Sequence, residues 1–481
     1  MNFDPCMGPK GHSFRPLIAA ALLSLALGGC NSAQSRARTA YAHYQTAIAT
    51  DDTVAARRAL LDLVAAQDDV ADNWVELGRL DTRLGRYADA YYAFTRAHEL
   101  DRGNPEIVRI LTQLALRVGD ISEAQRHARE LDVVAPGDPW AKLVSGYSAL
   151  NQHRFDEAIS ASDALLTTNS FDSNALVLKA RSLIGAQREQ EALKLLEDHV
   201  RLQPTDTASW RLLARIFERS SDWKKVATAA YHMVRIDPTD REAAVLFVKA
   251  ALRSGDIPAA KQVSTRLLTP ATDPVLIAKV LDLWADYWPS EQKADEARRL
   301  ARSANPTQKM VYAAFLDRID RPLDALALAA PFALLPVRAD RVEANAVVAD
   351  AMARTGKVND AKFRLDAVLA FDPGNATALR SRAELLLRTG QAKLAVADAQ
   401  KLVTVLPQSP RDRMLLSRCF AASGDSRQAE RVLWDAFHEI EASEPIFLAL
   451  SNANSAQPEV VSQIKEEYAL QLDAALSRGY L

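Results

Sequence analysis

The feature that most constrains the fold is a 34-residue period that begins at Ala37 and continues without an insertion to residue 274. Position 20 of seven successive units is alanine or valine, namely Ala56, Ala90, Ala124, Ala158, Ala192, Val226 and Ala260. A fixed period of this length is typical of an array of supersecondary units, each of which buries its apolar face against its neighbours. We therefore expect a repetitive array and not a domain built around one core.

Each unit is predicted to contain two amphipathic helices, which in residues 73–101 meet at Gly85. Position 8, where two helices must approach closely, is small in several units: Gly78, Gly146, Ala180 and Ala214. Position 32 is proline in several units: Pro136, Pro204 and Pro238. Proline disfavours helical geometry in the residue before it, so each second helix is expected to end where the next unit begins.

The residue types at fixed positions of the unit resemble those of the tetratricopeptide repeat. The matching residues, at positions 4, 7, 8, 20, 24 and 27, are Trp74, Leu77, Gly78, Ala90, Phe94 and Ala97. The resemblance implies an all-α fold, a right-handed α-solenoid of tetratricopeptide helix pairs. It also implies that the first helix of each pair lines a concave surface that binds the ligand.

The period divides the chain into predicted segments. We predict seven repeats over 37–274, irregular helical repeats over 275–341, three repeats over 342–443 and capping helices over 444–481. In the irregular segment, which holds Trp284, Tyr287 and Trp288, two helical pairs are expected. That segment is either a join between two blocks of repeats or a binding insertion. An amphipathic helix that begins at Pro458 is expected to cap the array, with partner binding as the alternative.

The N-terminus has the pattern of a processed lipoprotein. Residues 1–29 resemble a lipoprotein signal peptide, because an apolar run ends in Leu27-Gly28-Gly29-Cys30, similar to the lipobox of bacterial lipoproteins. The resemblance implies lipidation of Cys30, a tether over 30–36 and an envelope location. Asn31 favours the outer membrane, with the repeats facing the periplasm. An ordinary secretory peptide and an uncleaved anchor are the alternatives.

Catalytic and metal-binding patterns are missing from the sequence, so we expect neither an enzyme nor a cofactor or metal. The eight histidines are scattered. Cys419 lies among Leu415, Leu416 and Phe420 and is predicted to be a buried structural thiol. The net charge of −2 argues against a nucleic-acid partner.

The predicted concave surface carries many cations. At positions 5, 9, 12 and 13 of residues 71–274 these are Arg79, Arg83, Arg109, Arg117, Arg181, Arg211, Arg215, Arg219, Lys249 and Arg253. Only Glu218 carries the opposite charge at those positions, and Tyr147 interrupts the cations with an apolar patch. Guanidinium groups bind carboxylates and phosphates in a bidentate manner. We predict that these residues form a partner-binding groove.

The cations at the helix ends also have a purely structural interpretation. Positions 12 and 13 are favoured by the helix dipole, and acids such as Glu76 and Glu106 are available to pair with the arginines. By family resemblance, lipoproteins of this architecture serve in pilus assembly, outer-membrane protein insertion and exopolysaccharide export. We therefore expect a lipid-anchored scaffold that binds protein partners through acidic segments, with direct binding of an anionic polysaccharide during export as the alternative.

Overall fold

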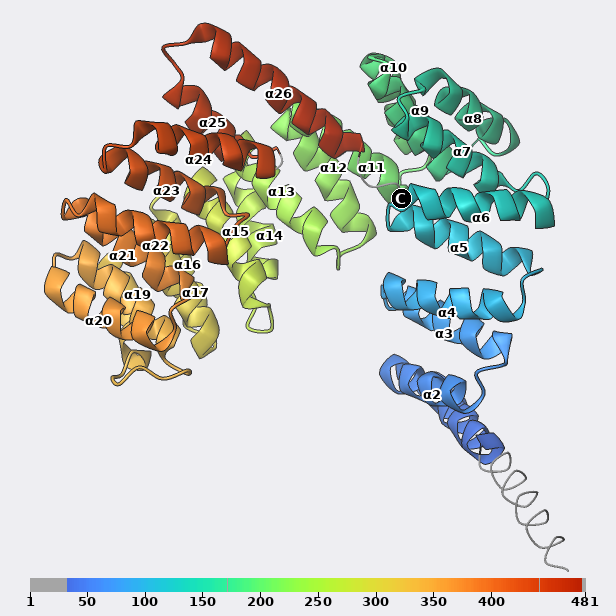
Figure 1. The fold of residues 1–481 in the computed structure, drawn as a ribbon, viewed down its shortest axis with the longest axis horizontal. Coiled ribbons are helices and arrows are strands. Elements are labelled where there is room, and N and C mark those ends of the chain that lie inside the picture. Colours follow the sequence, from blue (N-terminus) through green and yellow to red (C-terminus); the bar gives the residue numbers. More distant parts are fainter. Residues whose placement is uncertain (1–32, 171, 441, 478–481) are drawn as a thin grey trace, which may run out of the picture. The chain divides into compact units, whose positions relative to one another are not determined.

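The computed structural model describes residues 33–170, 172–440 and 442–477, with side chains to residue 472. Cys30 and the predicted signal peptide therefore lie outside the described residues. Every regular element within those ranges is a helix, which confirms the predicted all-α repeat array. The chain forms two compact units that divide between Gln187 and Arg188, inside the predicted repeat 173–206. Figure 1 shows both units as successive helical hairpins.

The first unit begins with a helix over residues 33–49. It continues with α2 (Thr53–Ala66), α3 (Ala71–Arg83), α4 (Tyr87–Leu100), α5 (Pro105–Arg117), α6 (Ile121–Val134), α7 (Pro139–Asn151), α8 (Phe155–Thr168) and α9 (Ser173–Gly185).

The second unit contains most of the helices. They are α10 (Glu189–Leu202), α11 (Thr207–Arg219), α12 (Trp223–Ile236), α13 (Arg241–Ser254), α14 (Ile257–Leu267), α15 (Pro274–Tyr287), α16 (Gln292–Ala301), α17 (Pro306–Arg318), α18 (Pro322–Ala329), the 3-10 helix η1 (Ala330–Phe332), α19 (Val342–Arg354), α20 (Val358–Phe371), α21 (Ala376–Arg388), α22 (Ala392–Val405), α23 (Pro410–Ala422), α24 (Ser426–Glu439), α25 (Glu444–Ala453) and α26 (Pro458–Ser477).

Aspartates fix the starts of many helices. The side chain of Asp138 accepts a hydrogen bond from the backbone N–H of Trp140 at 2.9 Å, and that of Asp240 accepts one from Ala243 at 2.9 Å. Such caps satisfy backbone donors that have no partner inside the helix and contribute about 1 kcal/mol each. Because they recur, the first helices begin at the same place in successive repeats.

A residue with positive φ ends the first helix at the same position in successive repeats. Gly85 (φ 71°) takes this conformation, as expected of glycine. His153 (φ 56°), Gln187 (φ 61°) and Ser221 (φ 55°) take it without being glycine. The tight turn is therefore imposed by the packing of the two helices and does not require glycine.

The position-20 residues lie at the contact between paired helices, as predicted. Ala56, Ala90, Ala158 and Ala192 are fully buried. Gly78 is packed so closely that an added Cβ would lie 2.7 Å from the ring of Phe94. Small residues at these positions therefore set the spacing of the helices.

The aromatic residues of the irregular segment belong largely to the core. Trp284 and Trp288 are 0% and 2% exposed, and their ring centroids lie 4.9 Å apart. The indole N–H of Trp284 donates a hydrogen bond to Ser264 Oγ at 3.0 Å. One apolar core runs from α11 through this segment to α19, so the two tryptophans are packing residues and not the surface of a binding insertion.

The C-terminal helices cover the last repeat. Ile446 and Leu450 of α25 and Ile464 of α26 are fully buried in one cluster with Phe437 of α24. This packing is consistent with the expected cap. Among the helices of the described residues, none has the length and apolar character needed to cross a bilayer.

Candidate partner-binding surfaces

First helices of several neighbouring repeats contact one another within each unit. In the first unit α5 contacts α7, which contacts α9. In the second unit the contacts run from α13 through α15, α17, α19, α21 and α23 to α25. Side chains from these helices therefore share one surface within each unit.

The predicted groove cations of the first unit are paired with acids. Arg79 donates hydrogen bonds to Glu76 Oε1 at 2.9 Å and to Glu106 Oε1 at 3.1 Å. Arg109 Nε donates to Asp138 Oδ2 at 2.8 Å, and Asp138 also caps α7. These arginines therefore connect one repeat to the first helix of the next.

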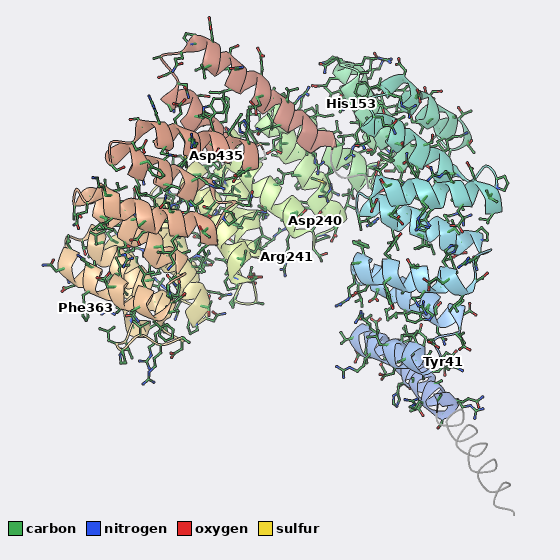
Figure 2. The ribbon with its side chains drawn as sticks, viewed as in Figure 1. Tyr41, His153, Asp240, Arg241, Phe363 and Asp435 are labelled. Atoms are coloured by element: carbon green, nitrogen blue, oxygen red, sulfur yellow. The ribbon has the colours of Figure 1, made fainter. Side chains whose placement is uncertain are left out.

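The same connection recurs in the second unit. Arg211 Nη2 donates to Asp240 Oδ2 at 2.9 Å, and Asp240 caps α13. Figure 2 labels Asp240 next to Arg241, the first residue of α13. Lys249 Nζ donates to Glu218 Oε1 at 2.6 Å. Glu218 is the one acid at the predicted groove positions, but helix caps and first-turn acids of the following repeat also reach the cations. The alternative, that acids such as Glu76 and Glu106 pair with these arginines, is confirmed for Arg79.

Other predicted groove residues differ in their surroundings. Arg83 and Arg117 are exposed, and Arg117 lies over the ring of Tyr87, 5.0 Å from its centroid. Arg219 forms an ion pair with Glu189. Arg181, in α9 of the first unit, is half-buried.

Position 9 of the first helix lies deeper than predicted in α7 and α11. Tyr147 occupies it in α7 and is 0% exposed, so its assignment to the partner-binding groove is wrong. Arg215 occupies it in α11 and is half-buried. Burial lowers the pKa of Arg215, and the positive charge of Arg211 lowers that pKa further. The exposure of position 9 therefore differs between repeats, because Arg79 occupies it in α3 with its side chain 48% exposed, whereas the ring of Tyr147 is covered completely.

Arg253 in α13 forms a carboxylate clamp with residues from three other helices. Its guanidinium donates to Glu444 Oε2 at 2.5 Å and Oε1 at 3.0 Å. The same guanidinium lies 4.1 Å from the ring centroid of Trp223 and 5.0 Å from that of Tyr287. The hydrogen bonds to Glu444 raise the pKa of Arg253. The sequence pattern identified Arg253 but not Trp223 or Glu444. Glu444 lies 191 residues from Arg253, and no local pattern in the sequence relates residues so far apart.

The structure offers little for nucleophilic or metal chemistry in the part of the chain it describes. Cys419 is buried, and burial raises the pKa of its thiol to about 11. The described residues contain no group of three or more histidine, cysteine or acidic side chains arranged to hold a metal ion. The expectation that Cys419 is a structural thiol is confirmed.

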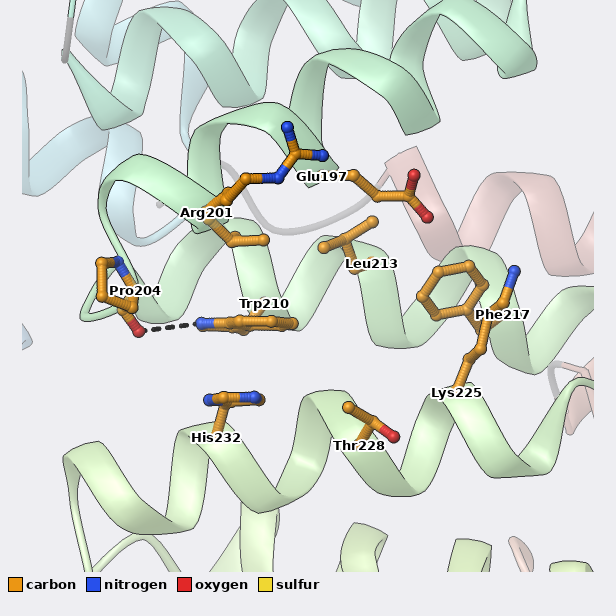
Figure 3. Close-up of a pocket in the computed structure, with 10 residues that line it drawn as sticks. Glu197, Arg201, Pro204, Trp210, Leu213, Phe217, Lys225, Thr228 and His232 are labelled. Carbon is orange, nitrogen blue, oxygen red and sulfur yellow. Dashed lines mark hydrogen bonds between the residues drawn. The ribbon is translucent and has the colours of Figure 1, made fainter.

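A pocket that sequence reasoning missed lies among α10, α11 and α12 (Figure 3). Its volume is about 450 Å³. The residues that line it are Glu197, Val200, Arg201, Pro204, Trp210, Leu213, Phe217, Lys225, Thr228 and His232. Trp210 stacks on His232 with ring centroids 4.1 Å apart and planes 3° from parallel. Its indole N–H donates to the carbonyl oxygen of Pro204 at 2.9 Å, which fixes the ring in the pocket wall.

Two family models match the chain. The N-terminal tetratricopeptide-repeat region of Psidin matches residues 140–273, and a tetratricopeptide-repeat model matches residues 349–412. Neither describes a catalytic domain.

A curated relative has a similar sequence. Cellulose synthase operon protein C of Xanthomonas axonopodis pv. citri (strain 306) is 26% identical over 373 residues, which are 74% of this chain and 23% of that protein. The chain therefore spans less than a quarter of the length of this relative.

Solved structures resemble parts of the chain at low identity. MamA (residues 41 to the end) from Desulfovibrio magneticus RS-1 is 14% identical with a TM-score of 0.31, covering 35% of this chain and 96% of its own. Pseudomonas aeruginosa pilF is 14% identical with a TM-score of 0.32, and the match covers 46% of this chain and 98% of that chain.

The sequence and the fold agree with the family models. The 34-residue period is seen in the sequence, and paired helices with small residues at their contacts are seen in the structure. Together with both family matches, they identify tetratricopeptide repeats in this chain, which the models match over residues 140–273 and 349–412.

Proposed function

We propose that the chain is a lipid-anchored scaffold of the cell envelope, which binds acidic segments of protein partners in exopolysaccharide export. Its first helices supply the binding surface. The observation that carries the proposal is the clamp at Arg253, where this surface already holds a carboxylate brought from a distant part of the chain. A partner's acidic side chains would meet the same chemistry at neighbouring cations.

Arginine suits this role because its planar guanidinium presents parallel donors to both oxygens of a carboxylate. Aromatic rings on either side remove water from the contact and add cation–π attraction. On α11, the side chains of Arg211 and Arg219 are 41% and 28% exposed, so their pairing with acids of the chain leaves part of each accessible. A partner carboxylate is able to join or replace the internal acids.

The connection to exopolysaccharide export rests on the similarity to cellulose synthase operon protein C. Anchoring rests on the lipobox-like sequence that ends at Cys30. Short tethers hold a domain near the bilayer, so an anchor would place the repeats close to membrane-bound partners. In this proposal the protein organises other components and performs no chemistry itself.

The test compares two anionic probes on the full chain by fluorescence anisotropy. One is a labelled oligoglutamate peptide, and the other is a labelled oligogalacturonate of similar charge. We expect saturable binding of the peptide that weakens as salt rises, because the contacts are charged. Tighter binding of the oligogalacturonate would overturn the proposal in favour of direct polysaccharide binding. If neither probe binds saturably, both the proposal of acidic protein segments and the alternative of direct polysaccharide binding are overturned.

A further inference from the structure

The pocket of Figure 3 has an apolar interior and a charged rim. Val200, Leu213 and Phe217 are buried and form the interior with Trp210. Arg201, Lys225 and Glu197 stand at the rim and are exposed. A concave, mostly apolar site with a few polar groups at its edge is the usual form of a binding pocket. All of these residues belong to the second unit.

An earlier repeat of the chain shows what fills the equivalent place. Trp74 corresponds to Trp210 four periods earlier, and its indole N–H also donates to a carbonyl oxygen six residues back, that of Asp68, at 2.9 Å. In that repeat the ring of Tyr92, which is 60% exposed, meets Trp74 edge-on, with centroids 6.0 Å apart and planes at 80°. The residue in the place of Tyr92 beside Trp210 is Thr228, which lines the pocket. The pocket is therefore open where a tyrosine ring packs in the related repeat.

From this comparison we propose that the pocket binds a tyrosine side chain of a protein partner, flanked by acidic residues. The ring would occupy the space beside Trp210 that Tyr92 fills beside Trp74. Edge-to-face contact with the indole and removal of the covered side of the ring from water both favour this occupant. The pocket is lined by other residues of α11 and by the second helices α10 and α12, and not by Arg211, Arg215 or Arg219, so the inference goes beyond the proposed function.

The rim specifies the chemistry around the tyrosine. Tyrosine hydroxyls of this chain donate to glutamates, Tyr44 to Glu76 at 3.1 Å and Tyr91 to Glu123 at 2.9 Å. Glu197 offers the same acceptor at the mouth of the pocket. Arg201 and Lys225 pair with Asp198 at 3.2 Å and with Asp222 at 3.8 Å, but their side chains are 74% and 58% exposed, so carboxylates beside the tyrosine can also reach them.

The experiment uses the full chain labelled with 5-fluorotryptophan and followed by fluorine NMR. The signal of Trp210 is assigned from its loss in Trp210→Phe. The probe is the peptide Ac-DEYED-NH2, and its control is Ac-DEAED-NH2. We expect the tyrosine peptide to shift the Trp210 signal saturably and the alanine peptide to leave it in place. Equal shifts with both peptides, or no shift with either, would overturn the proposal.

Two variants test the pocket from different directions. Thr228→Tyr places a tyrosine ring of the chain itself in the pocket. It is therefore expected to abolish the shift of the Trp210 signal that the tyrosine peptide causes. Arg201→Glu with Lys225→Glu changes two exposed side chains, which spares the fold, and is expected to weaken peptide binding about tenfold. Thr228→Ser is the matched control and should bind as the natural chain does. If both test variants bind the tyrosine peptide as tightly as the natural chain, the pocket is not its site. A shift produced by oligogalacturonate in place of the peptide would assign the pocket to a sugar and overturn the proposal.

Discussion

Arg253 at the end of α13 and Glu444 at the start of α25 share two hydrogen bonds, although 191 residues separate them in the sequence. The contact joins the last helices of the second unit to its early helices, and α26 also contacts α11 (Figure 1). The apolar cluster of α24–α26 is distinct from the core that begins at α11. The C-terminal helices are therefore held in two ways, by their own apolar core and by a charged contact to α13.

Replacing Glu444 with glutamine is expected to loosen the contact without unfolding the cap. Loss of a charge-assisted pair of partly buried groups costs about 1–2 kcal/mol, which corresponds to roughly tenfold faster amide exchange where opening is local. Hydrogen exchange measured by mass spectrometry should rise in residues 444–453. The core at Ile446 and Leu450 stays in place, so the melting temperature should change little.

The matched control for this variant is Glu459→Gln, which changes an exposed acid at the start of α26. Exchange in residues 444–453 should remain at the natural rate. If Glu444→Gln exchanges no faster than this control, the pair with Arg253 does not hold the C-terminal helices.

Acid is expected to destabilise the first unit through His127. The side chain is 1% exposed, and burial and the positive charge of Arg126 lower its pKa from 6.5 to about 4. Between these two values the unfolded chain binds a proton that the folded chain does not, so stability falls as the pH drops from about 6.5 to about 4. The loss from one such group is about 1–3 kcal/mol.

The measurement is the melting temperature at pH 7 and pH 4.5. His127→Gln removes the titrating group while keeping a side chain able to bond with Tyr91, whose hydroxyl lies 3.0 Å from His127 Nε2. We expect a smaller decrease on acidification in this variant than in the natural chain. The exposed His43→Gln should retain the full decrease. An unchanged decrease in His127→Gln would show that other groups control the acid response.

Gly78→Ala tests the close approach of α3 and α4. The added Cβ would lie 2.7 Å from two atoms of the Phe94 ring, which is 1% exposed and has no room to retreat. Overpacking of this kind costs about 1–3 kcal/mol, which exceeds the gain of about 1 kcal/mol from replacing a helical glycine by alanine. The melting temperature should fall. Gly103→Ala has nothing within 4 Å of the new Cβ and should melt as the natural chain does; equal melting of both variants would contradict the packing described.

Much of the fold was predictable because packing repeats with the sequence period. Alanines such as Ala90 and Ala192 mark the contacts between helices, and Gly85 marks the turn. His153 in the place of that glycine gave no warning of its positive φ, because the packed helices and not the residue type impose it.

The binding surface was less predictable than the fold. Position in the repeat identified Arg109 and Arg211 but not the helix caps Asp138 and Asp240 that reach them from the next repeat. Tyr147 was misplaced because position in the repeat does not fix burial: Arg79 and Tyr147 both occupy position 9, but the side chain of Arg79 is 48% exposed and Tyr147 is fully buried. Contacts between residues that are far apart in the sequence can be recognised only from the three-dimensional arrangement of the helices.

Anchoring at the N-terminus makes a separate prediction. Cys30→Ser removes the thiol to which lipid is attached, so the signal segment should remain uncleaved or the protein should leave the membrane fraction. Membrane fractionation with carbonate washing and N-terminal mapping would report the outcome. A Cys30→Ser protein that has lost its signal segment and still stays with the membrane would contradict lipid anchoring.

The central claim is that cations on the first helices bind acidic protein segments, and the most direct measurement is the dissociation constant of the full chain for a labelled oligoglutamate peptide. The test variant is Arg211→Gln with Arg219→Gln, the two accessible cations of α11. Glutamine is chosen because Arg211 contacts Asp240, and an acid there would repel the cap of α13. The control is Lys194→Gln with Lys224→Gln, which removes two exposed charges from the second helices α10 and α12. We predict that the test variant binds about tenfold more weakly while the control changes less than about twofold. Equal weakening in both variants, or none in either, would contradict the claim.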